Sequence, residues 1–160
     1  MRYYNKERYI ELVEEQAKGI DWFKENPKKW TELLSYQIVL SNHLFWLKRE
    51  KFLVIIEKFL NNTIEFEQFE KEFSELWVET ELQSHKEQQD GEVIKTIDPD
   101  PRSDSFCSRM TAIYRGFEIV EDEDWTKEEM KPFVESILIK LKSSAFNSEK
   151  SDVNSKENES

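Results

Sequence analysis

The chain of 160 residues is short of the residues that make turns and cross-links: it has three glycines, four prolines and one cysteine. The lone thiol of Cys107 cannot form an intramolecular disulfide, so nothing indicates a disulfide-stabilised secreted domain. So few turn-forming residues exclude an all-β sandwich or barrel. Because 38% of the residues are hydrophobic and 13% are aromatic, a core is still available. We therefore expect one all-α domain of long helices.

Long apolar runs are also missing. The longest, Phe52–Ile56, has five residues, far below the roughly 18 that a membrane-spanning helix requires. The N-terminus lacks the apolar segment of a signal peptide. We predict no membrane partner and a cytoplasmic location, or the plastid stroma if the Lys-, Asn- and Ile-rich composition reflects an organelle gene.

The residues that usually carry enzyme chemistry are scarce. There are two histidines, no glycine-rich phosphate loop and no cysteine pair for zinc. Glu81 and His85 lie four residues apart and could share a metal, but the repeated Glu-x-x-His motifs of a di-metal helical bundle are absent. We predict that the protein is not an enzyme and has no catalytic, metal-binding or cofactor-binding residues.

The net charge of -11 is unevenly distributed. Residues 1–64 carry 9 acidic and 11 basic side chains, whereas residues 65–129 carry 20 and 7, a net charge of -13. A field of this sign repels nucleic acid and attracts basic surfaces. The distribution predicts a basic protein partner and no nucleic acid; the alternative is that the charge serves solubility alone.

Apolar residues recur at helical spacing along most of the chain. Asn26-Pro27 and Asn61–Thr63 read as helix ends, and Ser41-Asn42 reads as a break. Residues 36–40 are β-branched enough for a strand, but no partner strand is evident. The spacing predicts helices over residues 5–25, 30–40, 43–60, 65–85, 105–117 and 126–141.

Residues 86–104 read as a loop, with a short extended piece at Val93–Ile97. Thr126 and Glu129 form a capping-box pattern at the start of the last helix. Pro132 should kink this helix or delay its start by two to four residues. Residues 144–160 are rich in Ser, Asn, Lys and Glu and cannot bury enough apolar surface to offset the entropy lost on ordering. We predict one helical domain over residues 1–143 and a disordered tail over 144–160.

Acidic residues concentrate in two places. Glu65, Glu72, Glu75 and Glu79 flank the apolar side of the fourth predicted helix, at spacings where like charges cost about 0.2–0.5 kcal/mol per pair. The run Glu121–Asp124 precedes the last helix, where it also suits the helix dipole. Both groups could be a partner-binding surface or merely a solvated one.

The segment Phe59–Phe69 has a Phe-Leu helix end, a short turn, an isoleucine and a second helix rich in Glu and Phe. With the Asp-Pro-containing Asp98–Pro101 and the Glu-rich start of the last helix, this order resembles the colicin D immunity protein family, the bacterial self-protective colicin-like immunity proteins. The resemblance covers about residues 50–143. The first 48 residues, with their additional helices, depart from the family pattern.

The resemblance implies an antiparallel bundle of four helices, here with extra N-terminal helices. It also implies inhibition of a tRNA-cleaving toxin by an acidic surface that occupies the substrate cleft of its nuclease domain. The alternative is a structural or assembly factor, possibly plastid-encoded, that holds another protein through its helical bundle. The predicted partner-binding residues are Glu65, Glu72, Glu75, Glu79, Asp98, Asp100, Asp104, Glu121 and Asp122.

Overall fold

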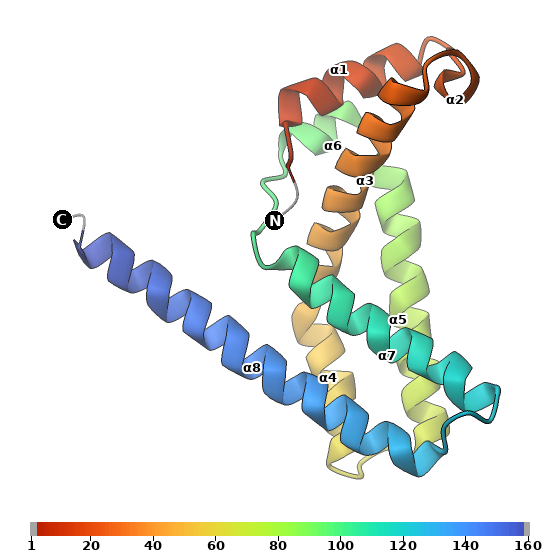
Figure 1. Cartoon of the computed structure of the whole chain (residues 1–160), viewed down its shortest axis with the longest axis vertical. Coiled ribbons are helices and arrows are strands. Elements are labelled where there is room, and N and C mark those ends of the chain that lie inside the picture. The colour runs from red at the N-terminus through yellow and green to blue at the C-terminus, as the bar shows by residue number, and fades with distance from the viewer. Residues whose placement is uncertain (1–2, 159–160) are drawn as a thin grey trace. The chain divides into compact units, whose positions relative to one another are not determined.

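A computed structural model describes residues 3–158, except for the side chains of Phe23 and residues 144–158. No strand occurs in this part of the chain, so the predicted all-α class is confirmed (Figure 1). The helices in chain order are α1 (Lys6–Gln16), α2 (Trp22–Glu25), α3 (Pro27–Leu47), α4 (Arg49–Leu60), α5 (Phe66–Glu87), α6 (Gly91–Lys95), α7 (Ser103–Glu121) and α8 (Lys127–Asn158). The predicted disordered tail lies outside the described side chains and stays a prediction.

The chain forms two compact units. Unit 1 comprises Met1–Arg49 and Glu75–Ser108, and unit 2 comprises Glu50–Ser74 and Arg109–Ser160. Helix α5 therefore begins in unit 2 and ends in unit 1, whereas α7 begins in unit 1 and ends in unit 2.

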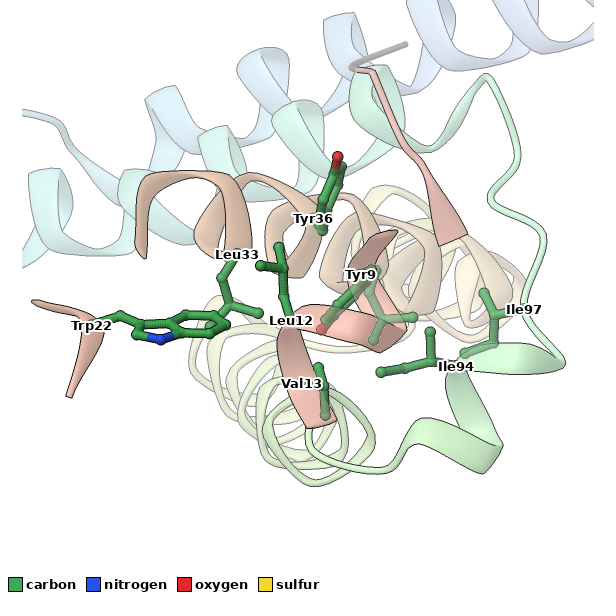
Figure 2. Packing of buried hydrophobic residues seen from close by; sticks show 9 residues of the cluster. Tyr9, Leu12, Val13, Trp22, Leu33, Tyr36, Ile94 and Ile97 are labelled. Atoms are coloured by element: carbon green, nitrogen blue, oxygen red, sulfur yellow. The ribbon is translucent and has the colours of Figure 1, made fainter. Parts of the chain in front are cut away.

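The core of unit 1 joins α1 to α3 and α6 (Figure 2). The rings of Tyr9 and Tyr36 stack with centroids 5.8 Å apart, and the Tyr9 hydroxyl donates to the Gln88 carbonyl at 3.3 Å. Leu12 of α1, Leu33 of α3 and Ile94 of α6 are fully buried. Because Tyr9, Leu12 and Val13 recur at helical spacing, α1 buries one face against both neighbours.

Phenylalanine rings dominate the core of unit 2. Phe59 of α4 stacks on Phe69 of α5 with centroids 4.3 Å apart, and Phe117 of α7 meets Phe69 and Phe73 edge-on at 5.4 and 5.6 Å. The periodicity that predicted the buried face of α5 is confirmed, since Phe66, Phe69 and Phe73 are all buried. This packing joins the C-terminal half of α7 to the first half of α5.

The predicted single helix over residues 5–25 is wrong. Helix α1 ends at Gln16 and α2 begins at Trp22. Between them Gly19 has φ +88°, which is the left-handed region that glycine adopts without strain. Ile20, which follows this turn, is 37% exposed.

The predicted break at Ser41-Asn42 is also wrong, because α3 continues to Leu47. The Asn42 side chain donates to Asp104 Oδ1 at 2.9 Å and therefore does not cap a helix. The interruption lies at Lys48, whose N–H reaches the carbonyls of Leu44 and Phe45 at 3.2 Å. At the other end of α3, Asn26 caps the helix and Pro27 occupies its first position.

Two expectations for the C-terminal half are corrected. Val93–Ile97 is not extended: the Asp90 side chain accepts from the N–H groups of Glu92 and Val93, and α6 follows. Helix α8 starts at Lys127, so the delayed start is wrong. The kink at Pro132, which lies inside the helix, stays a prediction. The predicted capping box is confirmed, since Thr126 and Glu129 exchange side-chain-to-backbone hydrogen bonds at 3.2 and 3.4 Å.

Candidate functional site: the acidic side chains

Two of the predicted partner-binding acids, both in the Asp98–Pro101 segment, bond to residues of their own unit. Asp98 pairs with Lys6 Nζ at 2.6 Å. The Asp100 carboxylate accepts from the Arg102 backbone at 2.8 Å and from its guanidinium at 2.9 Å. These hydrogen bonds lower the pKa of both carboxyl groups. Asp98 and Asp100 therefore have structural partners within the chain.

Arg102, which follows this segment, contacts an aromatic ring, and the segment itself bonds to a histidine. The Trp46 ring has the guanidinium carbons of Arg49 and Arg102 at 4.3 and 4.5 Å from its centroid. The Asp100 N–H donates to Nδ1 of the buried His43 at 3.1 Å. Burial lowers the pKa of His43. The negative charges of Asp100, Asp98 and Glu87 raise it, but by less. A neutral imidazole is required here, because only the neutral ring offers Nδ1 as an acceptor.

Three further predicted acids have polar partners. Asp104 accepts from Asn42 at 2.9 Å. Glu79 lies 3.7 Å from Lys48 Nζ, and Glu72 lies 3.7 Å from Lys58 Nζ. At this separation a surface pair contributes about 0–1 kcal/mol. The Glu79 side chain is 63% exposed, whereas that of Glu72 is 26% exposed. Glu75 is exposed.

The remaining predicted acids, Glu65, Glu121 and Asp122, are all exposed in unit 2. None of the three forms an ion pair with a side chain in the described part of unit 2. Glu121 ends α7, whose last turn has no basic residue. The C-terminal end of a helix carries partial negative charge, so a carboxylate there is unfavourable and a lysine would be favoured.

Two acids that the sequence reasoning missed complete this group. Glu67 and Glu70 lie three residues apart in the first half of α5, and Glu67 forms an ion pair with Lys127. Glu70 is half-buried, and its pKa is raised first by burial and then by the charges of Glu121 and Glu67. The signal for both was present, because i, i+3 spacing places them on one side of the helix.

We call Glu65, Glu67, Glu70, Glu121 and Asp122 the α5–α7 acidic surface. It offers carboxylates that can receive ammonium and guanidinium groups. The described side chains contain no group of three or more His, Cys, Asp or Glu placed to hold a metal ion. No described helix combines the length and the apolar character needed to cross a membrane.

Comparisons with family models, with curated proteins and with solved structures returned no match to this chain.

Proposed function

We propose that the protein binds a basic protein through the α5–α7 acidic surface. The observation that carries this proposal is the position of Glu121, at the negative end of α7 and close enough to Glu70 to raise its pKa. A carboxylate at the C-terminal end of a helix and a second carboxylate near Glu70 each lower the stability of the fold. A fold that required only solubility could have placed a lysine there, so we attribute the acids to a partner.

Ion pairs with a partner would remove this cost. A cation from the partner near Glu70 would offset the repulsion from Glu121 and Glu67 and would lower the Glu70 pKa again. A negative surface also speeds the encounter with a positive one, and this gain falls as salt rises. The uneven distribution of charge along the chain also supports a basic partner.

The finer form of the proposal follows from the resemblance of residues 50–143. In that form the partner is the nuclease domain of a tRNA-cleaving toxin, and the acidic surface occupies its substrate cleft. The four-helix antiparallel bundle, the cytoplasmic or plastid location and the absence of a nucleic acid partner belong to this proposal.

Charge reversal tests the proposal. The double variant Glu121→Lys/Asp122→Lys should bind the basic nuclease domain of a colicin D-type toxin with an association rate at least about tenfold lower than wild type at low salt. Wild-type binding should weaken as salt rises, and expression of the wild type should protect cells from the toxin. Association is measured by biolayer interferometry.

The matched control is Glu14→Lys/Glu25→Lys, which changes the net charge equally at exposed positions of α1 and α2. Its association rate should stay within about threefold of wild type. If the association rate fell equally in both variants, the overall charge of the protein would explain the loss, and the proposed surface would be contradicted. If the protein did not bind this nuclease but still bound other basic proteins in a salt-sensitive way, only the identification of the partner as a toxin nuclease would be contradicted.

The assembly-factor alternative stays open. Exposed aromatic side chains in residues 1–48 would favour it, but Tyr9, Trp22, Tyr36, Phe45 and Trp46 are buried. Tyr3, 75% exposed, is an exception among the described rings.

A further inference from the structure

Unit 1 has aliphatic side chains that the described part of the chain leaves exposed. On α3, Leu34 and Ile38 are 37% and 40% exposed and lie one helical turn apart. On the second half of α5, Val78 and Leu82 are 45% and 65% exposed, also one turn apart. Scattered exposed apolar residues are ordinary, but here each of two neighbouring helices exposes an aliphatic pair spaced one turn apart.

A shallow groove lies between α3 and α5, and Leu34 and Ile38 form part of its α3 wall. It has a volume of about 230 Å³, and its lining includes Leu34, Gln37 and Ile38 of α3, Glu81 and His85 of α5, and Gln88, which follows the end of α5. Val78 and Leu82 precede Glu81 and His85 by three residues, so they lie beside the α5 wall of the groove. We use the name α3–α5 groove for this groove together with Leu34, Ile38, Val78 and Leu82.

The polar groups at the floor of the groove already bond within the chain. The buried Gln88 amide donates to the Gln37 carbonyl at 3.3 Å and to Ser84 Oγ at 2.7 Å. These two hydrogen bonds are therefore already formed without a ligand. What the groove offers instead is aliphatic contact, with the exposed carboxylate of Glu81 at its edge.

The charges around the groove define the complementary partner. Residues Leu33–Leu47 of α3 contain no Asp, Glu, Lys or Arg, although 36% of the whole chain is charged. The adjoining segment of α5, residues 75–87, has Glu75, Glu79, Glu81 and Glu87 against one basic residue, Lys86, besides His85. A second copy of this chain would bring like charges together, whereas lysine or arginine would complement them.

We infer that the α3–α5 groove binds an amphipathic helix of another protein, whose apolar stripe is flanked by lysine or arginine. Two packed helices form a groove into which a third helix fits with anchors at i, i+3, i+4 and i+7. Leu34, Ile38, Val78 and Leu82 would contact the apolar stripe, and Glu81 would pair with a flanking cation. This inference uses no residue of the α5–α7 acidic surface and is independent of the proposed function.

The test uses two synthetic leucine–lysine peptides of about 18 residues and identical composition. In one the leucines lie on a single helical face, and in the other they are scattered around the helix. Calorimetry at about 150 mM salt should show the segregated peptide binding at least about tenfold more tightly than the scrambled one. Ile38→Gln and Leu82→Gln should each weaken the segregated peptide about fivefold or more, and Glu81→Lys should also weaken it.

The matched controls are Val54→Gln, at a 50% exposed aliphatic position on α4 outside the groove, and Glu25→Lys. Both should stay within about twofold of wild type. Equal affinity for the two peptides, or groove variants that bind like the controls, would overturn the inference. Light scattering that shows a dimer lost on Leu82→Gln would assign the groove to self-association instead. Binding to lipid vesicles that is lost with the same substitution would assign it to a membrane surface.

Discussion

At the scale of single residues, His43 shows how a buried ionisable group limits the conditions under which the fold is stable. Its Nδ1 accepts the Asp100 N–H and fastens the Asp98–Pro101 segment to α3. Because burial lowers its pKa below the ordinary 6.5, the folded protein resists protonation that the unfolded chain accepts. The stability that His43 contributes is present above about pH 6.5 and is lost as pH falls through the lowered pKa.

The two histidines provide a matched test of this dependence. His43→Gln should cost about 1 kcal/mol of unfolding free energy at pH 8, because a buried hydrogen bond is lost. The difference from wild type should narrow as pH falls towards 5.5, since only the wild type loses the contribution of the neutral ring. Urea unfolding measured at several pH values checks this.

The exposed His85 is the control. His85→Gln should run parallel to wild type over the same pH range. A His43→Gln curve that also runs parallel would contradict the assignment of a neutral, hydrogen-bonded imidazole.

At the scale of helices, the position of each boundary depends on a few residues. Asn62, with φ 59°, turns the chain between α4 and α5, as the Asn61–Thr63 segment predicts. Gly19 does the equivalent after α1, with φ +88°. The glycine at 91, by contrast, starts α6 without a positive φ.

This contrast gives a pair of substitutions with opposite expected signs. Gly19→Ala should lower the unfolding free energy by about 1–2 kcal/mol, because a side chain with Cβ is strained in the left-handed region. Gly91→Ala should be neutral or stabilising by up to about 1 kcal/mol through the unfolded chain. An added Cβ meets nothing within 4 Å at either position, so steric contact does not explain a difference.

Thermal unfolding of the two variants measures both effects. Equal changes would show that the backbone conformation at Gly19 does not determine where α1 ends.

The sequence predicted helices well where an apolar stripe and a strong end signal coincided, as in α5 and at the capping box of α8. It failed where a tertiary contact decided the local structure. Asn42 bonds to Asp104, 62 residues away, so α3 continues where a local reading places a cap. The buried Ile94 belongs to the unit 1 core, which favours a helical turn at α6 that local propensity did not indicate.

The candidate site was predicted in the same partial way. Charge counting identified the acidic half of the chain, but not which carboxylates have partners. The pairs Asp98–Lys6 and Glu79–Lys48 join residues far apart in sequence. The apolar periodicity of α3 was evident, yet periodicity alone does not show that Leu34 and Ile38 stay uncovered.

At the scale of the whole molecule, the net charge of -11 opposes folding through self-repulsion. The described ion pairs lie largely at the surface, where salt screens them. The balance between attraction and repulsion therefore depends on where the unpaired acids lie.

We expect Glu121→Lys/Asp122→Lys to raise the unfolding free energy by about 0.5–1 kcal/mol at roughly 50 mM salt, because it relieves Glu70 and suits the end of α7. The gain should shrink at about 500 mM salt, where these interactions are screened. Denaturant unfolding at the two salt concentrations checks it. Glu67→Lys is the control, and it should give no gain because it breaks the pair with Lys127.

A destabilised double variant would contradict this energetic account of the surface. In that case unfolding of the variant could explain a loss of partner binding. The stability measurement should therefore be made before the binding experiment.

The uncharged stretch Leu33–Leu47 also has an evolutionary consequence. Exposed helix positions without a partner accept lysine or glutamate readily, and such substitutions cost little stability. In descendants that keep the partner helix, selection should reject charges at Leu34, Ile38 and Leu82 while tolerating them at Val54. In lineages that have lost that partner, drift should introduce charged residues at all four positions at similar rates.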